Sequence, residues 1–347
     1  MNQRGRGEQK EKVVICGAGA IGTALGGYLA RAGHAPVLVG RPDHVEAMGT
    51  QGLTVESAEG PVRARVAAVT DASELVWASR DLIFLTCKTQ DTRGFIRQLA
   101  GAPRECPVVC LQNGVRNEEW AAESFTQVYG GVVNFSARLK GPGVVERTRS
   151  NELAIGRFPR GVDDGAERVA TILRDAGFQV YLDPEVMAWK WGKLLINLSN
   201  AFMALTNTWV EFAYADPSHR EFMEDLMTEG LAVLEAAGIH PRMGPDGDMA
   251  SFIRGLSRDG AGHPALKGDS DSKRTYPSTW QDLTRGRTET EVPFFNGEIV
   301  AMGRAAGIPT PYNAILLERM AARMAEGGGP GGWTVEGLTE EVRQRRS

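Results

Sequence analysis

The chain has 347 residues, of which 42% are hydrophobic and 24% are charged, and its formal net charge is −4. This composition is typical of a folded globular protein and excludes a chain that is disordered throughout. The charge is spread along the length, so no basic region predicts a nucleic-acid partner. No stretch approaches the roughly 20 apolar residues of a membrane span. We therefore expect a cytoplasmic protein with neither a membrane nor a nucleic acid as partner.

The cysteines and histidines show no spacing typical of a metal site or a disulfide framework. The four cysteines form no C-x-x-C pair, and three of them fall in or at the end of strand-like apolar runs. We therefore expect reduced thiols and no bound metal. Residues 1–12 are polar and mixed in charge, without the apolar core of a signal peptide, so they are predicted to be a disordered lead.

Residues 13–184 alternate between short apolar runs and helical segments. Strands are predicted at 13–16, 35–40, 81–87, 107–111, 151–156 and 178–182, with a polar strand pair over 53–69 and a second strand pair over 130–145 that turns at 140–143. Helices are predicted through residue 30, around residue 45 and over 162–176. This order predicts an α/β domain with a parallel sheet that is covered on both faces.

Residues 185–326 change in character and predict an all-helical second domain. Apolar residues recur there at helical spacing, and helices are predicted over 187–204, 219–237, 279–285, 290–306 and 311–325. The Gly-, Asp- and Pro-rich stretch 241–276 is predicted to be a partly mobile loop. A Gly-rich linker and a polar tail are predicted over 327–347.

A G-x-G-x-x-G motif follows the first predicted strand and opens the first helix. Gly17 is expected to form the tight turn, Gly19 to let a diphosphate approach, and Gly22 to pack helix against strand. Ala20 and Ile21 lie in the first helical turn, where free N–H groups and the helix dipole favour an anion. The alternative is a Gly-rich turn without a ligand. The motif predicts a Rossmann-type dinucleotide site.

Arg41 ends the second predicted strand, where an NAD site usually carries an acidic residue. A guanidinium suits a 2′-phosphate by charge and by bidentate geometry, so the sequence favours NADPH over NADH. An exposed turn residue is the alternative for Arg41. Lys88 and Asn113 follow two further predicted strands and are expected at the carboxyl edge of the sheet, where ligands bind in such folds.

One face of the helix predicted over 187–204 carries an ammonium and two amides. At about 100° per residue, Asn197 lies about 40° from Lys193 and Asn200 about 20° on the other side. Lys193 is predicted to donate a proton to a carbonyl oxygen as hydride arrives. A purely structural polar network is the alternative, and Lys190 is the rival proton donor on the same face.

Several separate motifs, in this order and spacing, resemble the ketopantoate reductase (2-dehydropantoate 2-reductase) family from about residue 13 to residue 325. They are the Gly loop with Arg41, Thr86-Cys87-Lys88-Thr89, Gln112-Asn113-Gly114, Lys193-x-x-x-Asn197, Ser278-x-x-Gln281-Asp282-Leu283, and Thr290-Glu291 followed by Phe295-Asn296-Gly297. The resemblance implies a Rossmann-type domain, a helical C-terminal domain, and a cleft between them that holds NADPH and a 2-oxo acid.

The resemblance also implies roles for individual residues. Lys88 and Asn113 would contact the nicotinamide end of the cofactor and the substrate, and Lys193 would be the general acid. Asn197 and Ser278 would bind substrate. Glu291 would hold the nicotinamide ribose or orient Lys193, although it also fits as a carboxylate in the first turn of a helix. The expected catalytic residues are thus Lys193, Asn113 and Glu291.

Three positions depart from the family pattern. Ala201 stands where the family typically has a second asparagine, and Asn200, one place earlier, lies about 100° round the helix and is kept as a substrate candidate. Thr275 replaces an asparagine and Pro293 an aspartate. Losing polar contacts is costly for a site built to pair a particular hydroxyl, so the hydride-transfer residues look complete and the substrate pocket looks altered.

The sequence therefore predicts an NADPH-dependent reductase of a small 2-oxo acid, with ketopantoate as the leading substrate. A related enzyme acting on another carbonyl in secondary metabolism is the first alternative, and a non-catalytic NADPH-sensing regulator is the second. A hydroxyisobutyrate-type dehydrogenase is disfavoured, because the second strand does not end in an acidic residue. The apolar helices of the second half are compatible with a homodimer.

Overall fold

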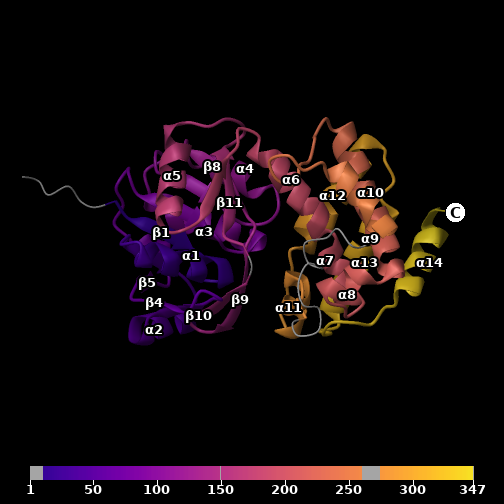
Figure 1. Cartoon of the computed structure of the whole chain (residues 1–347), viewed down its shortest axis with the longest axis horizontal. Helices are drawn as coiled ribbons and strands as arrows, with labels where there is room; N and C mark the ends of the chain where they lie inside the picture. Colours follow the sequence, from indigo (N-terminus) through magenta and orange to yellow (C-terminus); the bar gives the residue numbers. More distant parts are fainter. Residues whose placement is uncertain (1–10, 149, 260–273, 347) are drawn as a thin grey trace, which may run out of the picture. The chain divides into compact units, whose positions relative to one another are not determined.

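The computed structural model describes residues 11–148, 150–259 and 274–346. Residues 1–10 of the expected lead and 260–273 of the expected loop therefore lie outside the described residues. The chain divides into two compact units, Met1–Gln112 with Arg116–Met187, and Asn113–Val115 with Ala188–Ser347 (Figure 1).

The first unit is built on an eight-stranded sheet in the order β12-β11-β8-β7-β6-β1-β2-β5. Its strands are β1 (Val13–Cys16), β2 (Pro36–Val39), β5 (Ala67–Val69), β6 (Leu82–Leu85), β7 (Val108–Cys110), β8 (Val128–Val133), β11 (Glu152–Arg157) and β12 (Gln179–Leu182). Neighbouring strands are parallel except for β11 against β8. Strand order reverses at β1, which pairs with both β2 and β6, and such a switch point opens a ligand crevice at the carboxyl ends of the strands.

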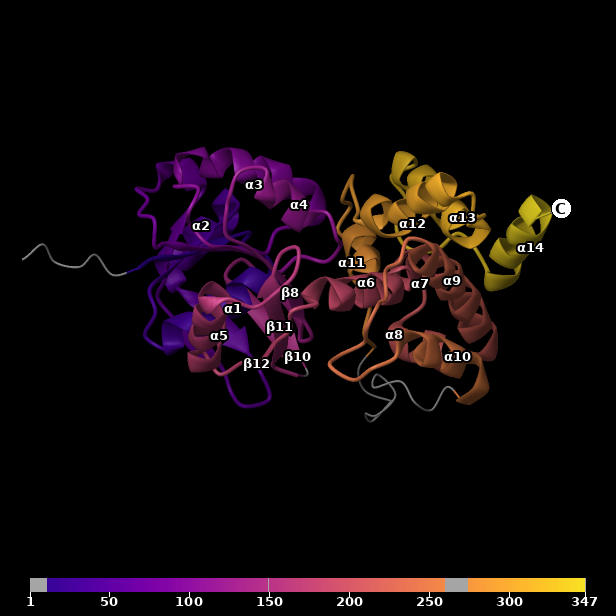
Figure 2. The ribbon, with the colours of Figure 1, turned by 90° about the horizontal axis from the view of Figure 1, so that it is seen from above.

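Alternate residues of β1 enter two different cores. Val13 and Ile15 pack with Leu25 and Leu29 of α1 (Ala20–Arg31), in the core that α5 (Asp164–Asp175) also joins. Val14 and Cys16 pack on the other face, in the core that includes Ala121 of α4 (Asn117–Ala122). Figure 2 shows α1 and α5 on one side of the sheet and α3 (Thr92–Gln98) and α4 on the other. The predicted parallel sheet with two covered faces is confirmed.

A second, four-stranded sheet has the order β4-β3-β10-β9. It consists of β3 (Leu53–Glu56), β4 (Val62–Ala64), β9 (Ser136–Gly141) and β10 (Val144–Thr148). This second sheet packs closely against α1 through β3, since a Cβ on Gly27 of α1 would lie 2.6 Å from Val55 Cγ2. The prediction of separate strand pairs over 53–69 and 130–145 was therefore incomplete, because β3 pairs with β10 from far along the chain, while β5 and β8 join the main sheet.

The second unit is helical, as predicted. Its helices are α6 (Val186–Asn197), which begins at the end of the first unit, α7 (Ser199–Leu205), α8 (Val210–Ala215), α9 (Pro217–Ala236), α10 (Met249–Asp259), α11 (Ser278–Thr284), α12 (Val292–Ala306), α13 (Pro311–Ala325) and α14 (Val335–Arg346). Its core contains the stacked rings of Phe202 and Phe222, whose centroids are 4.4 Å apart. Tyr312 packs edge-on against Phe222.

The single helix predicted over 187–204 is two helices, because the helical pattern is interrupted at Leu198. Asn296 Nδ2 donates to the Leu198 carbonyl at 3.2 Å, and the Ser199 hydroxyl donates to the Ile196 carbonyl at 2.7 Å. Side-chain bonds of this kind compete with the helical ladder. Asn296 also donates to Asn313 Oδ1 at 3.1 Å, so the junction between α6 and α7 is tied to α12 and α13.

Two predicted irregular segments contain helices. Within 241–276, α10 buries Ile253 and Leu256. Within the predicted polar tail, α14 buries Val335, Leu338 and Val342. Arg345 in this tail forms two hydrogen bonds with Glu318 of α13, at 2.9 and 2.6 Å, so the predicted polar tail is docked on α13.

Candidate functional site

The Gly loop adopts the conformation that its motif predicts. Gly17 has φ of +112°, and a Cβ there would lie 2.5 Å from the Cys87 nitrogen, so both the backbone angle and the space require glycine. A Cβ on Gly22 would lie 2.1 Å from the Gly17 carbonyl oxygen. These two glycines therefore let the loop, α1 and the segment after β6 approach one another.

Gly19 differs from its two partners in the motif. It is the N-cap of α1, and a Cβ placed on it would meet no atom of the described protein within 4 Å. The first turn of α1 contains no acidic residue. The first N–H groups of a helix have no partner within it. Open space beside the positive end of α1 fits the diphosphate of a dinucleotide, which Ala20 and Ile21 would face through their backbones.

Thr86, the residue directly after β6, forms hydrogen bonds to the Gly loop. The sequence did not predict this role. Its hydroxyl donates to the Gly17 carbonyl at 2.9 Å and lies 3.2 Å from the Cys16 carbonyl. Its backbone N–H donates to the same Cys16 carbonyl at 2.9 Å. Thr86 stands in the Thr86-Cys87-Lys88-Thr89 motif, but only Lys88 was given a function there.

The end of β2 lies against the Gly loop. The backbone N–H groups of Gly17 and Ala18 both donate to the Val39 carbonyl, at 2.9 Å each. A Cβ on Gly40 would lie 2.5 Å from Ala18 Cβ. Arg41 follows as the N-cap residue of α2 (Pro42–Gln51), and 51% of its side chain is exposed. The structure thus places Arg41 immediately after the contact with the loop.

Lys88 and Asn113 follow β6 and β7, as predicted. Lys88 precedes the short 3₁₀ turn Thr89–Asp91 and is partly buried. Gln112, beside Asn113, donates to Thr92 Oγ1 at 3.0 Å, and Thr92 donates to Asn117 Oδ1 at 2.8 Å. This buried chain of hydrogen bonds orders the carboxyl edge of the sheet.

In the second unit, α6 presents Lys193 to a buried carboxylate. Burial, the charge of Lys190 and, in the opposite direction, the charge of Glu291 set the pKa of Lys193 at about 8. Lys190 and Glu291 are each 3% exposed. Glu291 is the N-cap residue of α12, and its side chain makes no capping hydrogen bond. The structure therefore brings Lys193, Lys190 and Glu291 together.

The helix that carries Lys193 is packed closely through two glycines. A Cβ on Gly192 would lie 2.0 Å from the Arg242 carbonyl oxygen, and the Arg242 N–H donates to the Ala188 carbonyl at 2.9 Å. A Cβ on Gly230 of α9 would lie 2.5 Å from Leu195. These contacts fix α6 in place.

Asn197 and Asn200 lie side by side, as the helical spacing predicts. Asn200 Nδ2 donates to Asn197 Oδ1 at 3.4 Å. Asn197 Nδ2 is buried and has no hydrogen-bond partner among the described residues. A buried amide N–H without a partner costs free energy that a ligand oxygen would recover. Ala201, by contrast, is fully buried in α7.

Ser278 and the remaining departures lie near the starts of two helices. Ser278 is the first residue of α11 and is partly buried. The Thr275 backbone is held on both sides, since its N–H donates to Glu211 Oε2 at 2.9 Å and its carbonyl accepts from Val210 N at 2.9 Å. Pro293 lies in the first turn of α12, where proline is well tolerated.

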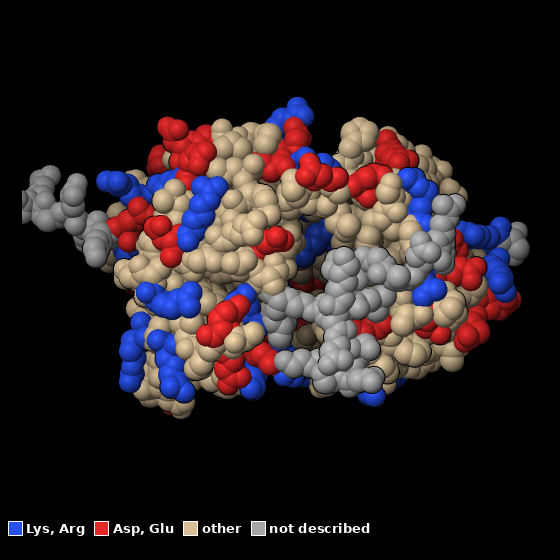
Figure 3. Space-filling model, viewed as in Figure 1, with Lys and Arg blue, Asp and Glu red and all other residues tan. Residues whose placement is uncertain are grey.

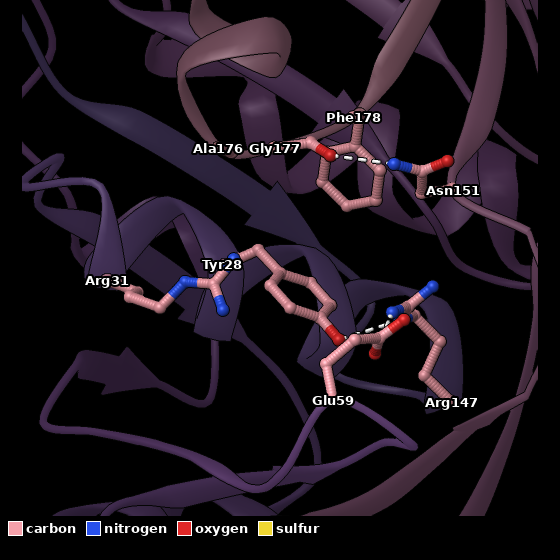
Figure 4. A pocket seen from close by; sticks show the side chains of 8 residues that line it. All are labelled: Tyr28, Arg31, Glu59, Arg147, Asn151, Ala176, Gly177 and Phe178. Carbon is pink, nitrogen blue, oxygen red and sulfur yellow. Dashed lines mark hydrogen bonds and ion pairs between the residues drawn. The ribbon is translucent and has the colours of Figure 1, made fainter.

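A small pocket in the first unit lies at the end of α1 farthest from the Gly loop (Figure 4). Tyr28, Arg31, Glu59 and Arg147 line it, with Asn151 and residues 176–178. Arg147 donates to Tyr28 Oη at 2.6 Å, to Glu59 Oε2 at 2.7 Å and to the Ser150 carbonyl at 2.6 Å. These bonds tie the second sheet to α1 and account for the polar residues of this pocket structurally.

Surface charge (Figure 3), hydropathy and the grouping of metal-ligating side chains indicate no further site among the described residues. On the face shown in Figure 3, acidic and basic side chains are both distributed over the coloured surface. Within residues 11–148, 150–259 and 274–346, no helix is long and apolar enough to span a membrane. The same ranges contain no group of three or more His, Cys, Asp or Glu residues that suits a metal ion. All four cysteines lie within the described residues, are buried and form no disulfide with one another.

Both units of the chain are similar to parts of one known protein family. Residues 13–160 match the family model described as ketopantoate reductase PanE/ApbA, and residues 185–324 match the model of its C-terminal part. A 2-dehydropantoate 2-reductase of Pyrococcus horikoshii is 30% identical over 323 residues, which are 92% of this chain and 99% of that protein.

Solved structures give the same result. The crystal structure of a PanE/ApbA family ketopantoate reductase from Ralstonia eutropha JMP134 has a TM-score of 0.78 at 31% identity, covering 91% of this chain and 99% of that one. A D-mandelate dehydrogenase with NADH and anilino(oxo)acetate has a TM-score of 0.80 at 23% identity, over 91% of this chain and 99% of that one, which shows a shared fold alone. The chain belongs to the ketopantoate reductase family and is an oxidoreductase that acts on CH–OH groups with a nicotinamide cofactor.

Proposed function

We propose that the protein reduces a small 2-oxo acid to the 2-hydroxy acid with NADPH, and that ketopantoate, reduced to pantoate, is the leading substrate. The observation that carries this proposal is Lys193, whose pKa of about 8 lies near neutral pH beside the buried carboxylate of Glu291. A general acid works best when its pKa lies near the working pH. Relatives named 2-dehydropantoate 2-reductase support the choice of substrate.

In this proposal Lys193 gives its proton to the carbonyl oxygen, and its positive charge stabilises the oxygen as negative charge develops there. The bound cofactor supplies hydride to the carbonyl carbon. Glu291 helps to keep Lys193 protonated, since its negative charge raises the pKa of that ammonium. The ammonium thus has an attractive partner that opposes the effects of burial and of Lys190.

The cofactor would lie along the Gly loop, with its diphosphate beside Gly17, Gly19, Ala20, Ile21 and Gly22. The open space at Gly19 and the absence of acidic residues from the first turn of α1 support this placement. Arg41 would pair with the 2′-phosphate that distinguishes NADPH from NADH. Lys88, Asn113 and Glu291 would contact the nicotinamide end, and the ordered edge at Gln112 supports the position of Asn113.

For substrate binding, Asn197 would donate its uncommitted amide N–H to an oxygen of the 2-oxo acid. Asn200 would orient Asn197, because its own amide is already engaged with Asn197 Oδ1. Ser278 would donate a further hydrogen bond from the start of α11. Ala201 and Thr275 stand where the family pattern has asparagines, which supports a pocket with fewer amide contacts than that pattern provides.

A second candidate is therefore a 2-oxo acid with a bulkier apolar side chain. It is favoured by Ala201, Thr275 and Pro293, each of which replaces a polar residue of the family pattern, some of which would contact the substrate directly. The fold neighbour bound to anilino(oxo)acetate binds an aromatic 2-oxo acid derivative, although likeness at 23% identity does not transfer that specificity.

Steady-state kinetics separate these candidates. The protein is assayed with NADPH and a panel of ketopantoate, branched aliphatic 2-oxo acids and phenylglyoxylate, and kcat/KM is compared. The leading proposal expects ketopantoate to have the highest kcat/KM. A tenfold or greater advantage for another 2-oxo acid would select the second candidate. If no 2-oxo acid of the panel causes NADPH consumption, the result contradicts the reductase proposal and favours a regulator that binds NADPH without catalysis.

A further inference from the structure

A buried histidine lies behind the residue proposed to read the 2′-phosphate. His44 occupies the first turn of α2 and is 2% exposed. Its backbone N–H donates to the Arg41 carbonyl at 3.0 Å, and its Nε2 lies 3.4 Å from Arg41 Nη2. One helical turn therefore connects the two residues through both backbone and side chain.

The chemistry of the pair fixes the proton on the imidazole ring. A guanidinium can only donate, so His44 Nε2 must be the unprotonated acceptor and the ring proton resides on Nδ1. His44 Nδ1 is buried and makes no hydrogen bond to any described residue. Burial lowers the pKa of His44, the Arg41 charge lowers it as well, and Asp43 opposes them. The ring is thus held neutral, the form in which it accepts from Arg41.

The other neighbour of Arg41 is a weaker constraint. Asp43 Oδ1 lies 3.8 Å from Arg41 Nε, and its side chain is 56% exposed. Exposed ion pairs of this kind hold a side chain poorly, because solvent screens them and both partners stay mobile. Of these two contacts, the one to the buried His44 ring therefore restricts the Arg41 guanidinium more.

The location of the pair gives this restriction a consequence. Arg41 is the residue after Gly40, and Gly40 packs against Ala18 of the Gly loop. The Arg41 side chain therefore extends from the point where β2 meets the cofactor loop. A long side chain that is ordered before binding loses less entropy when a ligand arrives. A neutral acceptor also leaves the positive charge of Arg41 available for an anion.

We propose that His44 is a positioning residue for cofactor selectivity: it accepts a hydrogen bond from Arg41 and orders the guanidinium for the 2′-phosphate of NADPH. This inference rests on the NADPH preference proposed above. Preordering one long side chain corresponds to about a 3- to 10-fold effect on affinity. It should affect NADPH and not NADH, which has no phosphate for Arg41 to bind.

The test measures KM for NADPH and for NADH, with kcat at saturating cofactor, in the wild type and in four variants. Arg41→Ala removes the guanidinium, His44→Leu removes the acceptor, His44→Gln returns an acceptor oxygen near the Nε2 position, and Asp43→Asn is the matched control.

His44→Leu should raise KM for NADPH about 3- to 10-fold with KM for NADH and kcat unchanged. His44→Gln should restore much of the selectivity, and Asp43→Asn should stay within about twofold of the wild type.

The outcomes separate this inference from the proposal beneath it. Equal effects of Arg41→Ala on the two cofactors would overturn the 2′-phosphate assignment and the role of His44 with it. If Arg41→Ala weakens NADPH alone while a folded His44→Leu keeps the wild-type ratio of the two KM values, only the role of His44 is overturned. Should His44→Leu not fold, His44→Asn, whose amide ends short of the Nε2 position, replaces it with the same expectation.

Discussion

Lys193 combines a burial that disfavours its charge with a carboxylate that favours it. Because the proposed reaction consumes its proton, activity should follow the protonated fraction of this one side chain. The pKa of about 8 places most of the population in the protonated form at pH 7. As pH rises through 8 that fraction falls, so kcat should decline by about tenfold for each further pH unit.

Lys190 provides a test of this electrostatic account. Its charge lowers the pKa of Lys193, so Lys190→Met, which keeps most of the buried volume, should raise that pKa. The alkaline decline of kcat should then move to higher pH than in the wild type. The measurement is kcat against pH for both proteins. A decline at unchanged pH would show that Lys190 does not act on the proton donor.

The individual residues of the site were predictable from the sequence to different degrees. Helical geometry alone predicted that Asn197 and Asn200 would be neighbours, and their side chains do meet, although the break at Leu198 places them on consecutive helices. Thr86 was missed because its role comes from a contact across the fold, to Gly17, whereas His44 was missed although it contacts a residue only three positions away, Arg41. The contact of His44 with Arg41 could have been predicted from its position one helical turn after Arg41 at the start of a helix. The involvement of Glu291 with Lys193 joins residues almost a hundred positions apart, which no spacing rule reveals.

The Gly loop allows a matched pair of substitutions at the level of an element. Gly19→Ala places its methyl where no described atom lies within 4 Å and where φ is −80°, so the fold should tolerate it. Gly22→Ala places a methyl 2.1 Å from the Gly17 carbonyl oxygen and 2.6 Å from Thr86 Oγ1, so the loop must shift. Gly22→Ala should therefore lower stability by about 1–3 kcal/mol.

The two variants should separate when cofactor binding is measured. Gly19→Ala should keep the Tm of the cofactor-free wild type but bind NADPH at least about tenfold more weakly, because its methyl occupies the proposed path of the diphosphate. Thermal unfolding without cofactor gives the Tm, and titration with NADPH gives the Kd. Normal NADPH binding by Gly19→Ala would contradict the placement of the diphosphate at this loop.

Elements with local patterns were predicted well. The strands around the Gly loop and the helix Pro311–Ala325 follow directly from apolar runs and helical spacing. The second sheet was not foreseen as a unit, because β3 and β10 are paired across about ninety residues of chain. The break at Leu198 was also invisible, since it depends on Asn296 and on Ser199 competing for backbone carbonyls.

At the scale of the whole molecule, composition and element order were enough to foresee a Rossmann-type unit followed by a helical one. They failed for α14, whose polar composition suggested a tail. Its few apolar residues, Val335, Leu338 and Val342, all fall on one face and become buried. Ion pairs between Arg345 and Glu318 and between Arg319 and Glu341 then hold it to α13. Three apolar residues are too few to predict docking without the surface that receives them.

The central claim is that this family member is a reductase whose proton donor is Lys193. The most direct test is kcat of Lys193→Ala with NADPH and the best 2-oxo acid of the panel, beside the Kd for NADPH and Lys140→Ala as an exposed lysine control. The account predicts that kcat falls by about 10²- to 10⁴-fold in Lys193→Ala, with the Kd little changed and the control unaffected. An unchanged kcat in a folded Lys193→Ala protein would contradict it.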